Sequence, residues 1–172
     1  MEEKINLITL ITEEEIKGAI RKIAVELAKT YEGEQLTIVA ELSSAFVFVA
    51  DLIRELPIDV TIQFIVKNKQ SDARSVIDLG VETSLKNRHV LLVTDVFYRG
   101  NTLKQVYDIV QSEEPLDVKV LALIDKKCKT KNEEIPVISL FSTEDVLLVG
   151  YGLTHNESYR GLKGIYNLVL EG

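Results

Sequence analysis

The residue types best suited to binding chemistry lie in one stretch of the chain, directly after the apolar run at residues 90–93. Gly100 allows a ligand to approach the backbone closely, and Thr102 can donate a hydroxyl hydrogen bond. If a helix begins here, the backbone amides of residues 99–103 lie at its positive end, where anions are stabilised. The stretch therefore predicts a phosphate cradle made by Arg99, Gly100, Asn101, Thr102 and Leu103, with the Asp95 carboxylate ready to accept hydrogen bonds from sugar hydroxyls.

An ordinary strand-to-helix turn is the alternative interpretation of these residues. Arg99 adds a cation directly to the loop, which favours anion binding without favouring turnover. Both interpretations stay open from the residues of this stretch alone.

Alternating strands and helices must position this stretch. A helix is predicted after Thr12, because its hydroxyl can cap a free amide while Glu15 bonds back to the cap, and apolar residues then recur every three or four positions. A second helix is expected to end near Glu55 and a third to occupy residues 101–112, while the polar residues 67–74 predict an exposed loop. Short apolar or alternating runs predict strands at residues 36–42, 58–66, 90–93, 118–124, 137–141, 146–151 and 166–170.

This alternation predicts right-handed crossovers and a mostly parallel sheet, in which ligands gather at the carboxyl ends of the strands. The 172 residues, 46% of them hydrophobic, suit one domain spanning residues 1–172. There are no internal repeats, and the 3 prolines fall between predicted elements. We therefore expect a single α/β domain.

Charge and cysteine content restrict the classes of partner. With 20 basic and 27 acidic residues the net charge is -7, which disfavours a nucleic-acid partner. Cys128 is the single cysteine and there are two histidines, so neither an intramolecular disulfide nor structural zinc is expected. No apolar stretch approaches the length of a membrane span. These observations predict a cytoplasmic protein without a membrane partner.

Residues 90–103 resemble the phosphoribosyl-pyrophosphate-binding motif of type I phosphoribosyltransferases, an apolar strand followed by acidic and apolar pairs and a Gly-x-Thr loop. Residues 11–16, 46–56 and 149–162 are similar, in order, to segments of the hypoxanthine-guanine branch of that family. The resemblance implies a parallel twisted sheet flanked by helices, with a core at roughly residues 12–150 and a small hood made by the chain ends.

The resemblance also implies an activity, a cofactor and an assembly. The family transfers 5-phosphoribose from phosphoribosyl pyrophosphate to hypoxanthine or guanine, giving IMP or GMP, with Mg²⁺ neutralising the departing pyrophosphate. Its members are generally dimers or tetramers, so we expect a homo-oligomer.

Several family roles map onto matching residues. By this resemblance Asp95 binds ribose hydroxyls, Gly100 and Thr102 belong to the 5′-phosphate loop, and Lys126 bonds the exocyclic oxygen of the purine. Leu148 stands where the backbone reads the base. Arg160 matches an arginine near the pyrophosphate. From the residues alone, Lys126 could instead be part of a solvated run with neighbouring lysines, and Arg160 could pair with Glu157.

The departures from the family pattern are equally specific. Tyr98 stands at the position of the catalytic Asp that accepts a proton from the purine, and a phenol with a pKa of about 10 is a poor substitute. Ser43 and Ser44 replace the Lys-Gly pair of the pyrophosphate loop, and Thr154 replaces an Asp that holds Mg²⁺. The remaining changes are Thr94 for the first acidic residue of the ribose pair, Leu147 for the aromatic that stacks on the base, and a lid at residues 67–74 without the family's Ser-Tyr pair.

Two hypotheses follow. The first is a purine-salvage phosphoribosyltransferase with impaired activity. The second is a catalytically inactive homologue that binds a purine nucleotide or serves a regulatory or interaction role.

Overall fold

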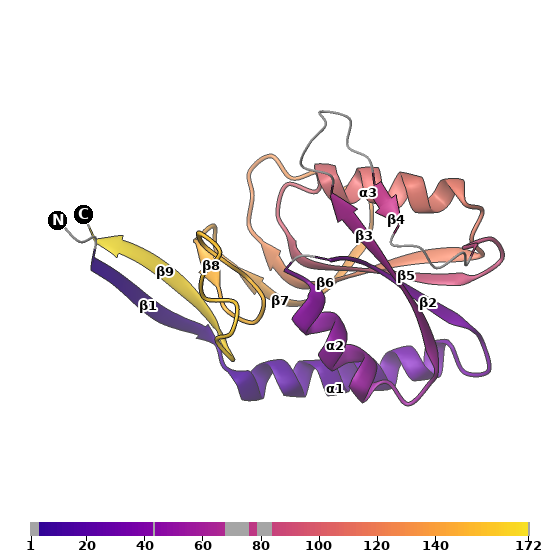
Figure 1. The fold of residues 1–172 in the computed structure, drawn as a ribbon, viewed down its shortest axis with the longest axis horizontal. Coiled ribbons are helices and arrows are strands. Elements are labelled where there is room, and N and C mark those ends of the chain that lie inside the picture. The colour runs from indigo at the N-terminus through magenta and orange to yellow at the C-terminus, as the bar shows by residue number, and fades with distance from the viewer. Residues whose placement is uncertain (1–3, 43, 68–75, 79–83, 172) are drawn as a thin grey trace.

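The larger sheet of the computed structural model, which describes residues 4–42, 44–67, 76–78 and 84–171, has six strands (Figure 1). They are β2 (Leu36–Glu41), β3 (Val60–Lys67), β4 (Val76–Asp78), β5 (His89–Phe97), β6 (Asp117–Lys126) and β7 (Val137–Thr143). Their order across the sheet is β4-β3-β2-β5-β6-β7. Strands β3, β2, β5, β6 and β7 pair with their neighbours in parallel, and β4 pairs antiparallel with β3 at the edge of the sheet.

Three helices cover the two faces of this sheet. Helices α1 (Glu13–Thr30) and α2 (Phe46–Glu55) lie on one face, and α3 (Asn101–Ser112) lies on the other (Figure 1). Side chains alternate along each central strand, so Leu91 and Val93 join the core under α1 and α2 while Val90 and Leu92 join the core under α3. The continuous apolar runs of the sequence are therefore strands buried on both faces.

The start of α1 follows the predicted capping box. The backbone amide of Glu15 donates to Thr12 Oγ1 at 3.2 Å, and the Thr12 amide donates to Glu15 Oε2 at 2.8 Å. These bonds satisfy two amides that the helix itself cannot pair.

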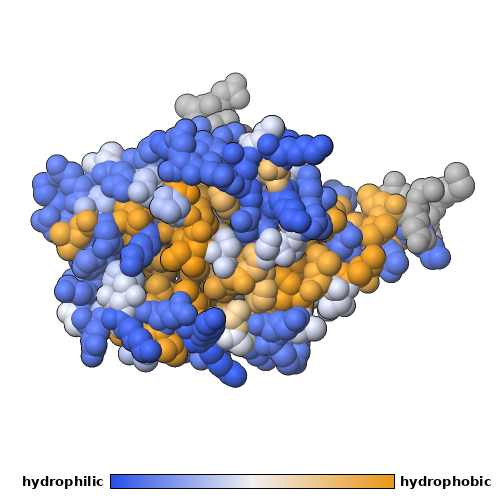
Figure 2. All heavy atoms as spheres, turned by 180° about the vertical axis from the view of Figure 1, so that it is seen from behind, coloured by the Kyte–Doolittle hydropathy of each residue, from blue (hydrophilic) through white to orange (hydrophobic). Residues whose placement is uncertain are grey.

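The chain ends form a second sheet beside the first. It consists of β1 (Lys4–Ile11), β8 (Leu148–Val149) and β9 (Ile165–Glu171), antiparallel in the order β1-β9-β8. The two-stranded part of β1 and β9 extends away from the larger sheet, and its exposed apolar side chains include Ile5, Ile8, Leu10 and Leu170 (Figures 1 and 2). The predicted α/β fold, a parallel twisted sheet flanked by helices with a small hood, is confirmed.

None of the described helices combines the length and the apolar composition that crossing a membrane requires.

Several predicted boundaries were wrong. Strand β5 does not stop at residue 93 but continues to Phe97, because Thr94, Val96 and Phe97 still pair with β6. The strand expected at residues 146–151 is reduced to Leu148–Val149, since Tyr151 has a φ of 53° that extended pairing does not allow. Strands β1 and β4 were not predicted, and the loop expected at residues 67–74 lies outside the described residues apart from Lys67 in β3.

We expect Thr12→Ala to lower the free energy of unfolding by about 1 kcal/mol, because the substitution removes the side chain that caps α1. Thr30→Ala is the matched control at the other end of the same helix, where the hydroxyl bonds only the Glu26 carbonyl, and it should change stability by less than about 0.5 kcal/mol. Urea unfolding of both variants measures the difference. Equal effects would contradict the assigned capping role.

Candidate functional site

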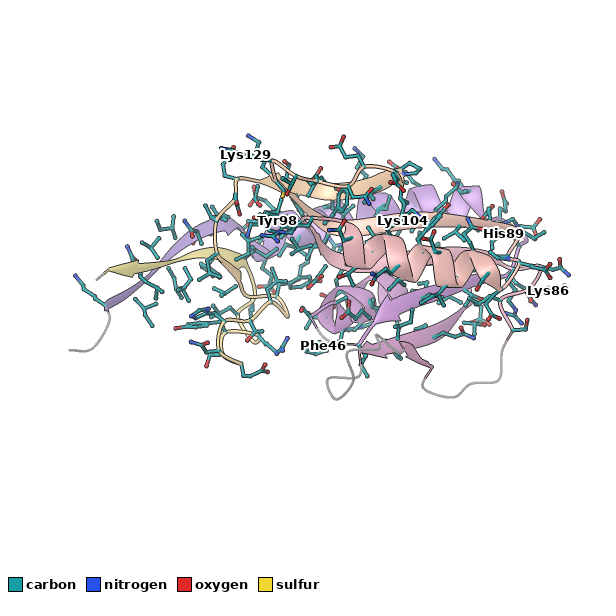
Figure 3. The ribbon with its side chains drawn as sticks, turned by 90° about the horizontal axis from the view of Figure 1, so that it is seen from above. Phe46, Lys86, His89, Tyr98, Lys104 and Lys129 are labelled. Carbon is teal, nitrogen blue, oxygen red and sulfur yellow. The ribbon has the colours of Figure 1, made fainter. Side chains whose placement is uncertain are left out.

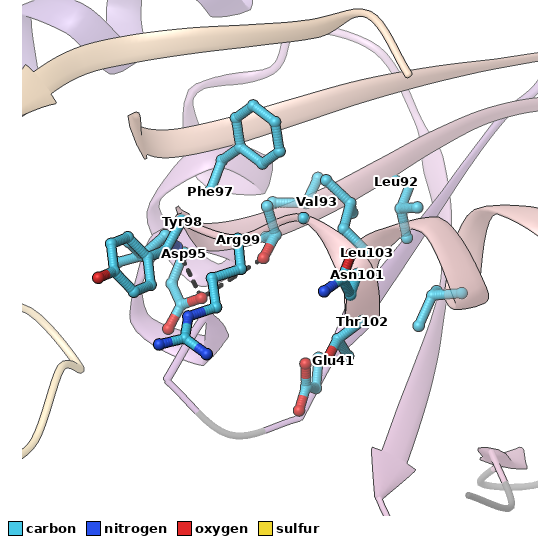
Figure 4. Close-up of a pocket in the computed structure, with 14 residues that line it drawn as sticks. Glu41, Leu92, Val93, Asp95, Phe97, Tyr98, Arg99, Asn101, Thr102 and Leu103 are labelled. Carbon is cyan, nitrogen blue, oxygen red and sulfur yellow. Dashed lines mark hydrogen bonds between the residues drawn. The ribbon is translucent and has the colours of Figure 1, made fainter. Parts of the chain in front are cut away.

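A cavity of about 430 Å³ lies at the carboxyl end of β5 and the start of α3 (Figure 4). Its lining brings together Tyr98, Asp95 and the whole predicted phosphate cradle, which are joined by Glu41 from the end of β2. The lining residues predicted from the sequence are Asp95, Tyr98, Arg99, Gly100, Asn101, Thr102 and Leu103. The parallel sheet thus presents this stretch at the edge where ligands of such sheets gather.

Gly100 determines the shape of the loop. Its φ is 82°, and a β-carbon built at this position would lie 2.6 Å from the Asn132 backbone oxygen and 2.9 Å from the Phe97 ring. Both observations exclude a larger residue without movement of the neighbouring backbone. The Gly100 carbonyl accepts the first helical bond of α3, from the Lys104 amide at 2.9 Å.

The N-terminus of α3 has the electrostatic character that an anion site requires. Its N-cap residue is Gly100, among the described residues no side chain caps it, and its first turn contains no acidic residue. Its unpaired backbone amides and the positive end of the helix dipole therefore face the cavity without a compensating negative charge from the first turn. Arg99 adds a cation at the same place. A phosphate group matches this arrangement in charge and in hydrogen-bonding capacity.

Asp95 was predicted at the end of the strand and lies within β5, which continues to Phe97. Its Oδ1 accepts a hydrogen bond from the Val96 amide at 2.7 Å and one from Thr94 Oγ1 at 3.4 Å. Asp95 and Arg99 both line the cavity (Figure 4). This fixed, half-buried carboxylate can accept further hydrogen bonds from hydroxyl groups of a ligand.

Tyr98 and Lys126 both contact the carboxylate of Asp145, which was not among the predicted site residues. The Tyr98 hydroxyl donates to Asp145 Oδ2 at 2.9 Å, and Lys126 Nζ lies 3.2 Å from Asp145 Oδ1. The Lys126 ammonium also lies 4.5 Å from the centre of the Tyr98 ring. Figure 3 places Tyr98 at the end of the sheet nearest the hood strands, far from His89 at the start of β5.

The bond between Tyr98 and Asp145 fixes the protonation of both groups. Donation to Asp145 raises the pKa of the Tyr98 phenol above its ordinary value of 10.0. The same bond, together with Lys126, lowers the pKa of Asp145 below 3.8. At neutral pH the pair is a protonated phenol and an ionised carboxylate, so the Tyr98 phenol is a weak proton acceptor.

Lys126 is more buried than the adjacent Lys127. Its side chain is 17% exposed, whereas that of Lys127 is 64% exposed and pairs with Glu144. The Lys126 side chain is therefore mostly buried, although the sequence also allowed a solvated lysine run.

The structure brings two of the predicted pyrophosphate residues to one place. Gly152 has a φ of 92°, and a β-carbon there would collide with the Ser44 backbone oxygen. The Gly152 carbonyl accepts from Arg160 Nη1 at 2.8 Å, and Arg160 also pairs with Glu157 at 3.3 Å. Gly152 thus links Ser44 to Arg160, while Ser43 lies outside the described residues.

The segment around Gly152 is tied to helix α2. The Tyr151 hydroxyl donates to Asp51 Oδ2 at 2.5 Å, and burial of the phenol is the main cause that raises its pKa, followed by this bond. The contact holds the hood against the helix that follows the predicted pyrophosphate loop.

The two predicted purine residues of the hood do not line the described cavity. Leu148 is 8% exposed and pairs with Asn167 in the hood sheet, and the Leu147 carbonyl accepts from the Leu168 amide at 2.8 Å. They lie two and three residues after Asp145, which connects their segment to Tyr98 and Lys126.

The residues present do not fit a protein-held Mg²⁺ at the position predicted for it. Thr154 donates its hydroxyl to the Ser158 carbonyl at 2.8 Å and offers no carboxylate. Within the described part of the chain, no group of three His, Cys, Asp or Glu side chains is close enough to ligate a metal. Mg²⁺ is commonly bound by one or two carboxylates together with substrate phosphates. Among the predicted site residues, Asp95 is the only one with a carboxylate.

Sequence reasoning missed Glu41 and Asp145. Glu41 ends β2, at the same sheet edge as the phosphate loop, so the rule that sites gather at strand ends could have selected it. Asp145 lies 47 residues from Tyr98 in the sequence, and no local pattern marks that contact.

We expect Gly100→Ala to destabilise the protein by about 1–3 kcal/mol, because alanine disfavours the left-handed conformation and its methyl group meets the Asn132 backbone. Gly18→Ala is the matched control in α1, where a β-carbon meets nothing within 4 Å, and it should stabilise by about 0.5–1 kcal/mol. Urea unfolding measures the change in the free energy of unfolding for both variants. A neutral Gly100→Ala would contradict the described loop.

We expect Asp145→Asn to lower the pKa of the Tyr98 phenol, because the substitution removes the negative charge that favours its protonated form. Ultraviolet absorbance during alkaline titration measures phenolate formation. Subtracting the titration of the same variant with Tyr98→Phe isolates Tyr98 from the other tyrosines. An unchanged or higher pKa would show that Asp145 does not hold the hydroxyl in solution.

Comparison with known proteins shows the family of this chain. The family described as "Phosphoribosyl transferase domain" matches residues 9–156. The hypoxanthine phosphoribosyltransferase of Haemophilus influenzae is 31% identical over 173 residues, with 94% of this chain and 95% of that protein covered. A hypoxanthine-guanine phosphoribosyltransferase of Staphylococcus aureus is 29% identical, with 92% of each chain covered.

Solved structures show the same likeness in three dimensions. The crystal structure of a hypoxanthine-guanine phosphoribosyltransferase from Bacillus anthracis superimposes with a TM-score of 0.85 at 31% identity, covering 96% of this chain and all of that one. A ternary substrates complex of a mutant hypoxanthine phosphoribosyltransferase from Trypanosoma cruzi gives a TM-score of 0.84 at 27% identity, covering 94% of each chain. This chain belongs to the type I phosphoribosyltransferases, in the hypoxanthine-guanine phosphoribosyltransferase family.

Proposed function

We propose that this protein is a purine-salvage phosphoribosyltransferase with impaired turnover. It transfers 5-phosphoribose from phosphoribosyl pyrophosphate to hypoxanthine or guanine, giving IMP or GMP. The observation that carries this proposal is the cavity that gathers Asp95 and the loop at residues 99–103 at the positive end of α3. A phosphorylated ribose suits this site because its phosphate matches the loop and its hydroxyls match the carboxylate.

Each predicted side chain has a place in the proposed reaction. Asp95 accepts from the ribose hydroxyls, and the amides of residues 99–103 bind the 5′-phosphate together with the Thr102 hydroxyl. Lys126 donates to the exocyclic oxygen of the purine, beside the backbone of Leu148 and the side chain of Leu147. The residues assigned to pyrophosphate are Ser43, Ser44 and Arg160.

Impaired turnover follows from Tyr98. A transferase needs a group that accepts a proton from the purine as the new bond to N9 forms, and a neutral phenol is a poor acceptor. The hydrogen bond to Asp145 raises the pKa of Tyr98 further above neutrality. Loss of a general base commonly costs about 10²- to 10⁴-fold in rate, so we expect slow transfer.

Magnesium enters this proposal as part of the substrate. Thr154 offers no carboxylate where the family pattern has one. The ion therefore reaches the cavity as the complex with phosphoribosyl pyrophosphate, and the roles assigned above depend on side chains and amides of the chain.

A catalytically inactive nucleotide-binding or regulatory homologue is the second candidate. It is favoured by one observation, which is that Asp145 engages both Tyr98 and Lys126. Such a protein would keep the phosphate loop and bind a purine nucleotide without making one.

The remaining assignments follow the family and the composition. We expect a homo-oligomer, a dimer or a tetramer, that functions in the cytoplasm as a single domain over residues 1–172. The net charge of -7 disfavours nucleic acid as a partner.

We expect Tyr98→Asp to raise the rate of nucleotide formation at least about tenfold, because a carboxylate restores the missing proton acceptor. Tyr98→Asn is the matched control and should give no increase, because asparagine is similar in size to aspartate but has no basic group. The assay follows IMP or GMP production from the base and phosphoribosyl pyrophosphate with excess Mg²⁺ at high protein concentration. No product from any of these folded proteins would favour the inactive homologue.

A further inference from the structure

Asp145 contacts Tyr98, which lines the cavity, and Lys126, which is predicted to contact the purine. It lies between β7 and β8, whereas Tyr98 follows β5 and Lys126 ends β6. One carboxylate oxygen accepts from the Tyr98 hydroxyl at 2.9 Å, and the other lies 3.2 Å from Lys126 Nζ. A single carboxylate therefore connects three segments that are far apart in the sequence.

These contacts restrain the Lys126 ammonium from two directions. The carboxylate attracts it on one side, and the face of the Tyr98 ring lies 4.5 Å from it on another. Because a lysine side chain is flexible and its ammonium can donate in any direction, such restraints decide where its remaining hydrogens point. The side chain is 17% exposed, which leaves little room for other orientations.

Stability alone does not explain the arrangement. The Asp145 side chain is 56% exposed, and ion pairs in contact with water contribute little to the free energy of folding. The neighbouring pair of Lys127 and Glu144 is more exposed still, and neither of its residues lines the cavity. What distinguishes the Asp145 pair is that Asp145 also binds Tyr98, which lines the cavity.

We propose that Asp145 is a specificity-determining positioning residue, which holds the Lys126 ammonium so that it donates to the 6-oxo group of a purine. This inference rests on the proposed function, in which Lys126 contacts the base. A restrained and charge-compensated ammonium selects a ligand by one directed hydrogen bond. A free ammonium would attract any acceptor nearby, so the carboxylate makes the presence of the 6-oxo group decisive.

The discriminating ligands are IMP and purine riboside 5′-monophosphate, which differ only in the 6-oxo group and its N1 hydrogen. By titration calorimetry, the wild-type protein should prefer IMP by about tenfold, as one hydrogen bond to a charged group allows. Asp145→Asn should lower this preference to about threefold or less, through weaker binding of IMP. Binding of ribose 5-phosphate, which reaches the phosphate loop and carries no base, should stay unchanged.

Two further variants separate positioning from a general effect. Glu144→Gln removes the adjacent carboxylate, whose partner is Lys127, and should leave the preference for IMP intact. In a Lys126→Gln background, Asp145→Asn should have no additional effect on the preference, because the group that it positions is already gone.

The outcomes distinguish the inference from the proposed function. A wild-type protein that binds ribose 5-phosphate but shows no preference for IMP would overturn the role of Asp145 while leaving the phosphoribosyl site standing. The same role would be overturned if Asp145→Asn kept the preference, bound IMP more tightly or lost ribose 5-phosphate as well. Failure of the folded wild-type protein to bind ribose 5-phosphate would overturn the proposed function, and the role of Asp145 with it.

Discussion

The parallel pairing of β5 with β2 and β6 is the constraint on which the site depends. In this register Val93 lies opposite Ala40 of β2 and Leu121 of β6, so the three strands end at the same edge of the sheet. Glu41 and the phosphate loop meet there for that reason, and Lys126, at the end of β6, contacts the ring of Tyr98, which lines the same cavity. A slip of one residue would turn the buried side chains of β5 toward the opposite face, so the two apolar cores fix the register.

Left-handed glycines and bonds from the hood then shape the space above this edge. Gly100 turns the chain from β5 into α3, and Gly152 brings the hood against Ser44. Tyr151 anchors the hood to α2 through Asp51, and Asp145 reaches the ends of β5 and β6. The hood is thus attached to the parallel sheet by specific polar contacts, some of which involve side chains proposed to contact ligand.

Much of the fold could be predicted from the sequence, because local patterns encode it. The capping box at Thr12 and the helix at Asn101–Ser112 follow from local residue types and spacing, and both are confirmed. Strand β1 was not predicted, because much of it is exposed and its apolar residues do not keep to one face. Its partner β9 lies at the opposite end of the chain, where no local pattern reveals the pairing. The phosphate loop could be selected because its residues are consecutive, whereas Asp145 acts through contacts that only the folded chain creates.

The most direct test of this account is binding of ribose 5-phosphate compared with ribose, measured by titration calorimetry on the wild-type protein. The account predicts that ribose 5-phosphate binds with favourable enthalpy while ribose gives no detectable heat at the same concentration, because the α3 amides and Arg99 recognise the phosphate group. No binding of ribose 5-phosphate by the folded protein, or equal binding of both sugars, would contradict the claim that the chain has a phosphoribosyl-binding cavity.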